Sequence, residues 1–465
     1  MESDTNSSHG KEPECPEIII DVENAKPAQR CSECCIYMVP KKLREVKKEA
    51  YTPKLISIGP VHHNKELNHM DHHNKNEVDN KKEQENMKSL KLRYFNEFFC
   101  RRTWKGQKEF ANIIIKNEEN IRQCYAEEIS LPGKEDFVFV KMILLDSIFI
   151  IELFLRTASR SGYEKDDYIL SKPWLEEGIT YDLILLENQL PLFILNELYS
   201  QSGDEGCFIT LACTFFFPKH KELPTEMAGV KHFTDLHRNF YRPPPPDRRL
   251  NPKTNSPIEH LYRATKLVDN AGLIFQTNQF VGKRESLDIK LKKPWEIRPT
   301  SCLMNCFINF SGFKCLQTRL VVPQFVVDDG TEELFRNLMA LEQCHYPSKA
   351  YICNYIVLLD YLINSEEDVE LLVDKRVIVN SLGSNQAVAD MVNKLCLEIV
   401  EVDSYYRHIA DDLNNLYDSH WNQNLASLRN VYFKNIWRGS ATVVGVLVLL
   451  ITIFNFLKPF VFKNI

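Results

Sequence analysis

Apolar side chains recur along most of this chain with the period of an amphipathic α-helix. One such face is formed by Val388, Met391, Val392 and Leu395, which are spaced at i, i+3, i+4 and i+7. This spacing gathers apolar residues on one side of a helix, where they can pack on a core while the other side contacts water. The sequence therefore predicts a mainly α-helical protein with a large multi-helical body.

Two longer apolar stretches, residues 142–155 and 183–198, contain acidic or other polar positions. Acidic residues are rare inside helices that cross a membrane, so both stretches are predicted to be buried core helices. Pro191 interrupts the second stretch. We expect a new helix to begin near that proline, with Asn188 or Gln189 as its cap.

A third apolar stretch, residues 439–457, contains no charged residue in nineteen positions. A helix of that length extends roughly 28 Å, close to the hydrocarbon thickness of a bilayer. Tyr432 and Trp437 are residue types that favour the membrane interface, and Arg438 and Lys458 flank the stretch. We therefore predict a transmembrane helix here. The alternative is a core helix or a helix that binds a partner.

The position of this span predicts a topology. Only eight residues follow residue 457, which is typical of a tail-anchored protein with its body in the cytosol. Basic residues precede the span, in agreement with the positive-inside rule. The expected localisation is a single-pass membrane protein, and the length of the span does not distinguish the plasma membrane from an endomembrane.

A minor β element is predicted near residues 285–328. The segments 286–291 and 318–327 have the composition of strands, and Pro323 would confine the second strand to an edge of a sheet. Further along, Asp329 and Glu332 have the spacing of a capping box. The fold class expected is mainly α, with this strand or hairpin element and one C-terminal transmembrane helix.

Composition and proline content suggest how the chain is divided. Residues 1–30 are polar and without a period, which is typical of disorder. Four consecutive prolines near residue 243 indicate a stiff linker. The expected divisions are a disordered N-terminus (1–30), a body (31–432) with an N-terminal lobe to about residue 240, a Pro-rich linker (242–256) and a C-terminal lobe (257–432), and a transmembrane helix (439–457).

Charge and cysteine usage narrow the class of protein. The formal net charge is −6, so a general affinity for nucleic acid has no electrostatic support. The chain has 14 cysteines and no apolar signal segment at its N-terminus. We therefore expect free thiols in a reducing compartment.

Five histidines form the sharpest candidate for a metal site: His62, His63, His69, His72 and His73. On a helix, His69 would share a face with His72 and His73, a spacing that can hold Zn²⁺. The sequence has no HExxH motif, and the neighbouring residues are Asn and Lys, which supply no dry second shell. A polar histidine-rich loop is the favoured interpretation, and no cofactor is predicted.

Cysteines form two loose clusters, one at residues 31–35 and one at residues 302–315. Neither has the CxxC…CxxC spacing of a strong zinc motif. The first cluster is compatible with zinc, with an acylation site or with the entry to an apolar strand. The cysteines concerned are Cys31, Cys34, Cys35, Cys302, Cys306 and Cys315.

Four acids occur within apolar stretches: Asp146, Glu152, Asp182 and Glu187. Buried carboxylates can have the shifted pKa values of catalytic acids, but they also cap helices and pair with basic residues. Structural pairing is favoured. The sequence contains no GxSxG, no P-loop, no GxGxxG and no EF-hand loop, so no catalytic residue is assigned and no enzyme is predicted.

Eleven stretches, in order from residue 34 to the C-terminus, resemble one known family. They are CCIYMVP (34–40), AYTPKLISIGPVHH (50–63), KLRYFNEF (91–98), CYAEEI (124–129), FVFVKMILLDSIFIIELF (137–154), YDLILLENQLPLFILNEL (181–198), RATKLVDNAGLIF (263–275), LVVPQFVVDDGTEELFRNLMALEQC (320–344), YIVLLDYLINSEEDVELL (355–372), LGSNQAVADMVNKLC (382–396) and the LRNVYFKNIW that leads into the span. On these residues the chain resembles the plant family known as domain of unknown function 247. Any one stretch is weak evidence for the family, but the occurrence of all eleven in this order is specific to it.

The resemblance implies a single-span plant membrane protein without known catalysis. Some grass members of the family are implicated as pollen determinants of self-incompatibility that recognise a partner. The resulting hypothesis is a membrane-anchored, non-enzymatic recognition or signalling protein, with the bilayer and an unidentified protein as partners and no nucleic acid. Stretches 64–88, 200–260 and 300–318 are candidate partner surfaces. The alternative is a membrane-bound enzyme that uses Asp146, Glu187 or the His62/His63 pair.

Overall fold

The structure of the chain is a computed structural model. It describes residues 33–62, 75–101, 105–129, 137–159, 167–219, 227, 229–245, 256–278, 286–294, 317–432 and 436–461. The predicted disordered N-terminus, residues 1–30, lies outside this part of the chain, as does most of the predicted linker. The described chain is predominantly helical, which confirms the predicted fold class.

The first half of the chain is helical in the part that the structure describes. Its elements are α1 (Lys41–Val46), η1 (Lys48–Tyr51), α3 (Lys75–Arg101), α4 (Gln107–Gln123), α5 (Val138–Ser159), α6 (Pro173–Asp182), α7 (Leu192–Tyr199), α8 (Phe208–Phe216) and α9 (Phe233–Tyr241). Segments 33–40 and 52–59 lie between or before these helices and contain turns, bends and one isolated β-bridge at Ile36.

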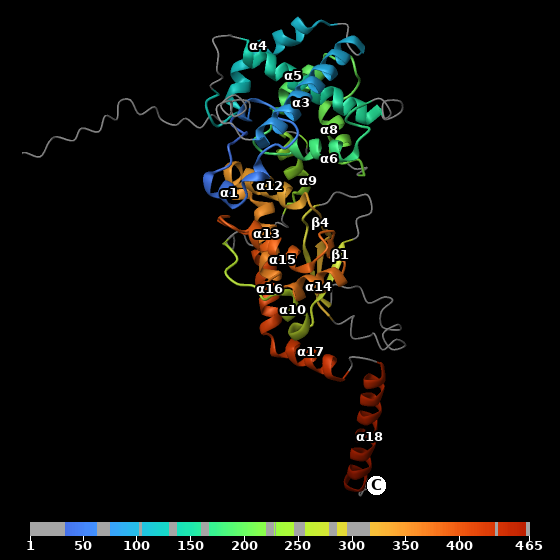
Figure 1. Cartoon of the computed structure of the whole chain (residues 1–465). Coiled ribbons are helices and arrows are strands. Elements are labelled where there is room, and N and C mark those ends of the chain that lie inside the picture. The colour runs from blue at the N-terminus through green and yellow to red at the C-terminus, as the bar shows by residue number, and fades with distance from the viewer. Residues whose placement is uncertain are drawn as a thin grey trace, which may run out of the picture.

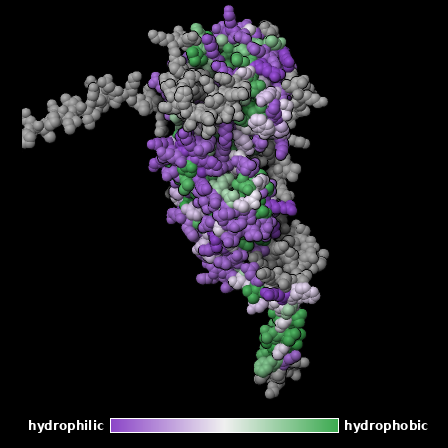
Figure 2. Space-filling model, in the orientation of Figure 1, coloured by the Kyte–Doolittle hydropathy of each residue, from purple (hydrophilic) through white to green (hydrophobic). Residues whose placement is uncertain are grey.

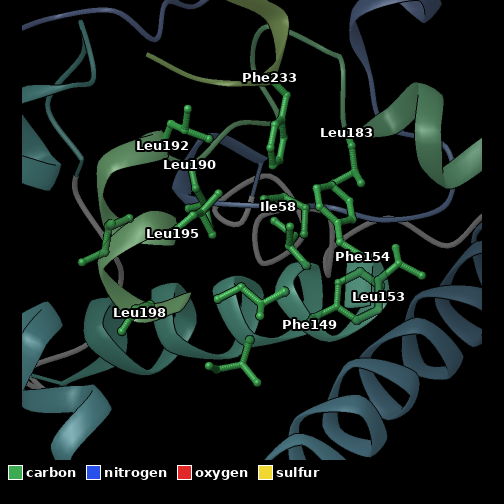
Figure 3. Packing of buried hydrophobic residues seen from close by; sticks show 14 of the residues in the cluster. Ile58, Phe149, Leu153, Phe154, Leu183, Leu190, Leu192, Leu195, Leu198 and Phe233 are labelled. Atoms are coloured by element: carbon green, nitrogen blue, oxygen red, sulfur yellow. The ribbon is translucent and has the colours of Figure 1, made fainter. Parts of the chain in front are cut away.

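Helix α5 occupies the centre of the first hydrophobic core. It is buried along almost its whole length because its apolar residues point in all directions and other helices cover them. Figure 3 shows Phe149, Leu153 and Phe154 of α5 facing Leu195 and Phe233 from the segments above. The prediction of a buried core helix over residues 142–155 is therefore confirmed.

The second predicted core helix, residues 183–198, is only partly helical. Helix α6 ends at Asp182 and α7 begins at Leu192, so residues 183–191 form a buried non-helical loop. Neither predicted cap is correct, because the residue at the N-cap of α7 is Pro191 and no side chain caps it. The apolar composition reflects burial of this loop and not a helix.

The second half of the chain contains helices and short strands. Its helices are α10 (Ala264–Ala271), α12 (Thr331–His345), η7 (Pro347–Lys349), α13 (Tyr351–Leu362), α14 (Glu366–Asp374), α15 (Asn385–Leu395), α16 (Arg407–Asp418), α17 (His420–Tyr432) and α18 (Ile436–Val461). Its strands are β1 (Ile274–Asn278), β2 (Lys290–Lys292), β3 (Arg319–Pro323), β4 (Phe325–Val327) and β5 (Ile378–Asn380). The predicted capping box is wrong, because α12 begins at Thr331 after Gly330 without a side-chain cap.

The strands form two small sheets. In the first, β3 lies in the middle, parallel to β1 and antiparallel to β2, and in the second β4 is parallel to β5. The prediction that Pro323 confines its strand to an edge is wrong. Pro323 is the last residue of the central strand, beyond the residues that pair with β2, so that its missing N–H interrupts no ladder with β2.

A second hydrophobic core lies among α10 and α12–α16 and the strands beside them. A small third cluster, which we call the junction, contains residues from the first and second halves of the chain: Val39, Leu43, Ala50, Tyr51, Leu186, Ala340 and Leu341. Figure 1 shows the two halves stacked, with α12 between them, α17 crossing the far end of the body and α18 running away from it.

Candidate functional site

The buried loop 183–191 is held by its own polar side chains. Asn188 donates from Nδ2 to the carbonyls of Ile56 (2.9 Å) and Asp182 (2.8 Å), and its Oδ1 accepts from the N–H of Ile58 (2.6 Å). Gln189 donates to the carbonyls of two residues in the loop and accepts from the N–H of Phe233 (2.9 Å). Because a buried loop cannot bond to water, these two amides replace the missing helical hydrogen bonds.

Glu187 is fully buried at the same place and has three partners. Its Oε1 accepts from the N–H of Val39 (2.8 Å) and from the guanidinium of Arg44, and its Oε2 lies 3.3 Å from Nε2 of His62. A buried carboxylate is stable in this setting only when such donors compensate its lost hydration. Glu187 therefore fixes segment 33–46 and the end of segment 52–62 to the loop.

Two further acids hold the backbone of segment 54–59. Asp182 accepts from the N–H groups of Lys54 (2.9 Å), Leu55 (2.6 Å) and Ile56 (2.8 Å). Burial raises the pKa of Asp182 to about 6, although these three donors act in the opposite direction. On α5, Asp146 accepts from the N–H of Gly59 (2.9 Å).

Gly59 is required by the geometry of this segment. Its φ is +71°, and a Cβ added to it would lie 2.7 Å from the carbonyl oxygen of Gln189. Lys91 of α3 completes the arrangement, because its Nζ lies 2.5 Å from both Asp146 Oδ1 and the carbonyl of Ser57. We call this group of Glu187, Asp182, Asn188, Asp146 and their partners the buried polar network.

Glu152 belongs to a separate buried cluster around Arg156. The guanidinium of Arg156 bonds to Glu152 (2.7 Å), Asp167 (2.7 Å) and Glu97 (2.5 Å) and lies 4.1 Å from the ring centre of Tyr94. The phenol of Tyr94 in turn donates to Asp167 (2.6 Å). These bonds lower the pKa of Asp167 despite its burial and raise that of Arg156. Each of the four acids singled out in the sequence thus has basic or backbone partners, as the structural interpretation predicted.

Helix α18 is apolar on every side and lies outside both cores. Residues Trp437–Leu457, 21 positions, are long and apolar enough to cross a membrane, and none of the window is buried inside the chain. Figure 2 shows this helix as a hydrophobic rod projecting from a largely hydrophilic body. The predicted span, 439–457, falls within it. Trp437 is 81% exposed in its first turn, and Tyr432 ends the preceding helix.

Comparison with known proteins decides the family. The sequence profile of a family described as a plant protein of unknown function, domain of unknown function 247, matches residues 36–451. The chain belongs to this family. The match covers nearly all of the body and the first part of α18, to residue 451.

Two proteins from Arabidopsis thaliana are similar to this chain along most of their length. UPF0481 protein At3g47200 is 29% identical over 457 residues, which cover 90% of this chain and 84% of that protein. Putative UPF0481 protein At3g02645 is 23% identical and covers 90% of this chain and 88% of that protein. No solved structure matches the chain.

The histidines and cysteines that the sequence offered as candidate metal ligands lie partly inside and partly outside the described residues. Of the five histidines, the structure places only His62, beside Glu187; His63, His69, His72 and His73 lie outside the described residues. Among the residues described, no three His, Cys, Asp or Glu side chains are arranged to hold a metal ion. The enzyme alternative named Asp146, Glu187 or the His62/His63 pair, and of these residues His62 and Glu187 are in contact.

Of the two cysteine clusters, only Cys34 and Cys35 are described. Cys35 is buried, and its N–H bonds to the carbonyl of Cys124 (2.9 Å) in a short parallel bridge with the end of α4. This agrees with an apolar strand entry, one of the three interpretations considered. Cys31, Cys302, Cys306 and Cys315 lie outside the described residues.

Sequence reasoning missed the basic partners Arg44 and Lys91 and the role of Asn188 and Gln189. A signal was present, because the polar triplet at 187–189 stands in the middle of an apolar stretch. A polar group in such a stretch must find a partner when buried. Which segment supplies the partner depends on contacts between residues more than a hundred positions apart in the chain.

Proposed function

We propose that this protein is a membrane-anchored, non-enzymatic interaction component of plant cells, with α18 as its single membrane span. The observation that carries the proposal is the apolar window Trp437–Leu457, which none of the described body covers. In a soluble protein a helix that is apolar on all sides would expose its apolar side chains to water, which is unfavourable. Insertion in a bilayer removes these side chains from water.

The orientation that we propose places the helical body in the cytosol. Arg429, Lys434 and Arg438 lie on the body side of the window, and this side is expected to remain on the cytosolic face. The non-enzymatic part of the proposal is supported by the pairing of the buried acids, which gives Asp146 and Glu187 structural roles. Of the proposed partner surfaces, stretch 300–318 lies almost entirely outside the described residues, whereas stretches 64–88 and 200–260 are described in part.

Deletion of residues 439–465 tests the anchor. We expect the full chain to stay in the membrane pellet after an alkaline carbonate wash, and the truncated chain to move to the soluble fraction. Deletion of residues 1–30 is the matched control and should leave the pellet unchanged. Membrane association of the truncated chain after the wash would contradict the anchor.

Protease protection and proximity labelling test the rest of the proposal. In sealed vesicles from plant cells, added protease should digest the body if it faces the cytosol, and protection of the body would contradict that orientation. A labelling enzyme fused to the N-terminus should then mark a reproducible protein set that the truncated chain loses. Turnover of a small molecule by purified full chain, abolished by Glu187→Gln without loss of folding, would favour the enzyme alternative instead.

A further inference from the structure

Helix α17 presents an apolar stripe away from the body. Trp421, Leu425, Leu428 and Tyr432 are 71%, 40%, 43% and 51% exposed. At about 100° per residue these four side chains fall within about 60° of one another around the helix axis. A surface helix of a soluble protein has the opposite arrangement, with its apolar stripe on the core.

The opposite face of α17 holds the helix on the body. Ala426 is buried there, and Asn430 donates to the carbonyl of Asp269 at the end of α10 (3.0 Å). Gln423, on the same face, donates to the carbonyl of Tyr417 of α16 (2.8 Å). The stripe is therefore turned outward by bonds that fix the helix, and a small rotation cannot bury it.

The end of α17 lies beside the start of the apolar window. Residues 433–435 separate it from α18, and the hydroxyl of Thr442 lies 3.4 Å from the carbonyl of Tyr432. Thr442 is five positions inside the window that begins at Trp437. If α18 crosses a bilayer, the C-terminal turn of α17 lies at the depth of its boundary, and Figure 1 shows α17 lying across the foot of the body from which α18 departs.

The charge of this part of the chain also fits a lipid surface. From residue 419 to the C-terminus there is no Asp or Glu, whereas Arg429, Lys434 and Arg438 are present, in a chain whose net charge is −6. Tryptophan and tyrosine favour the interface, and basic residues favour anionic headgroups.

We propose that α17 lies in the interface of the same bilayer that α18 crosses, with its Trp421–Leu425–Leu428–Tyr432 stripe immersed among the headgroups and upper acyl chains. This inference rests on the proposed anchor and deepens it. The helix fixes the body close to the lipid surface, because α17 is packed on α10 and α16 on one side and on lipid on the other. The occupant of the stripe is an anionic bilayer surface, and not a second protein.

Quenching by brominated lipids tests the proposal on the full chain. The protein is reconstituted in vesicles of phosphatidylcholine and phosphatidylserine whose acyl chains carry bromine near the headgroup, and tryptophan fluorescence is compared among Trp421→Phe, Trp437→Phe and Trp174→Phe. We expect Trp421 and Trp437 each to supply about half of the lipid-quenched signal. Trp174 is the matched control, since it is 62% exposed on α6 in the first half of the chain and should supply none.

A double variant extends the test to the stripe. Leu425→Gln with Leu428→Gln should reduce the lipid quenching of Trp421 severalfold and leave that of Trp437 unchanged. Asn424→Gln with Ser427→Gln, at exposed positions of α17 outside the stripe, is the control and should change neither.

Three results would overturn the inference. If Trp437 is quenched by lipid while Trp421 responds only to a quencher dissolved in water, the anchor stands and α17 does not touch the bilayer. If Trp421 is shielded from both quenchers and becomes exposed on dilution, a second copy or another protein covers the stripe. If neither tryptophan is quenched by lipid, the anchor fails as well.

Discussion

At the scale of single residues, this protein places polar side chains where helical hydrogen bonds are missing. Asn188 alone serves one N–H and two carbonyls from segments far apart in the sequence. An unpaired buried polar group costs about 1–3 kcal/mol, so the loop 183–191 depends on its amides.

Replacing Asn188 by alanine should destabilise the protein strongly. The change leaves the N–H of Ile58 and two carbonyls unpaired, and we expect a loss of about 3 kcal/mol in the free energy of unfolding. Chemical denaturation of the detergent-solubilised full chain measures it. Asn112→Ala, at an exposed position of α4, is the control and should change stability by less than about 0.5 kcal/mol. Equal effects would contradict the role of Asn188.

His237 of α9 is a buried histidine packed on aromatic rings. Its ring centre lies 4.9 Å from that of Phe216 and 4.7 Å from that of Phe217, and neither ring nitrogen has a hydrogen-bond partner among the described residues. Burial lowers the pKa of His237 to about 3. The folded protein therefore holds it neutral while the unfolded chain takes up a proton below pH about 6.5, so stability falls as the pH drops from 6.5 towards 3.

His237→Phe should remove this acid sensitivity. Between pH about 7.5 and pH about 5, wild type should lose about 2 kcal/mol more unfolding free energy than the variant. Urea denaturation at both pH values measures the difference. His260→Gln, at an exposed position, is the control and should show the same pH dependence of stability as wild type. If His237→Phe also keeps the pH dependence of wild type, His237 is not the source of the acid sensitivity.

At the scale of elements, α3 and α5 are joined by charge as well as by apolar packing. Arg156 of α5 bonds to Glu97 of α3, to Glu152 within its own helix and to Asp167 in the following segment. Removing one partner of a buried ion pair is costly, because it leaves the remaining charges buried without compensation.

Arg156→Met should therefore lower the free energy of unfolding by about 3–5 kcal/mol. Arg93→Met is a matched control on the same acid, since Arg93 is half exposed and pairs with Glu97 at i,i+4. It should cost less than about 0.5 kcal/mol. Thermal unfolding monitored by circular dichroism compares Arg156→Met with Arg93→Met. Similar shifts in Tm would show that the buried cluster contributes no more to stability than the exposed ion pair.

At the scale of the whole molecule, α12 connects the two halves of the body. Asn337 accepts from the N–H of Leu186 (3.0 Å) and donates to the carbonyl of Ala50 (2.7 Å). Five residues further on, Glu342 is fully buried, bonds to Arg238 of α9 (3.0 Å) and accepts from two N–H groups at the start of α13. Together with the apolar junction, these bonds predict that both cores unfold together.

Weakening this connection should separate the two cores. We expect wild type to show one unfolding transition and Asn337→Ala combined with Arg238→Met to show two, as measured by calorimetry and by hydrogen exchange of α5 and α13. Gln343→Ala is the control, since Gln343 bonds to Val400 within the second half. Two transitions already in wild type would contradict the coupling.

Much of this organisation could be read from the sequence. The apolar period predicted a helical body, the uncharged run predicted α18, and acids inside apolar stretches predicted buried pairing. These features depend on residues close together in the chain, where the period and hydropathy are local properties.

Tertiary structure alone decided what pairs with what. The stretch 183–191 reads as helix, yet it is a loop because the backbones of segment 54–59 and of residue 233 offer its amides better partners. Pro323 predicts an edge strand, yet β3 is the central strand of its sheet. This is possible because β2 pairs only with residues 319–321 of β3, so the missing N–H of Pro323 interrupts no hydrogen bond to β2. The outward face of α17 is set by bonds to α10 and α16. Such choices depend on contacts between distant residues, which local propensity does not encode.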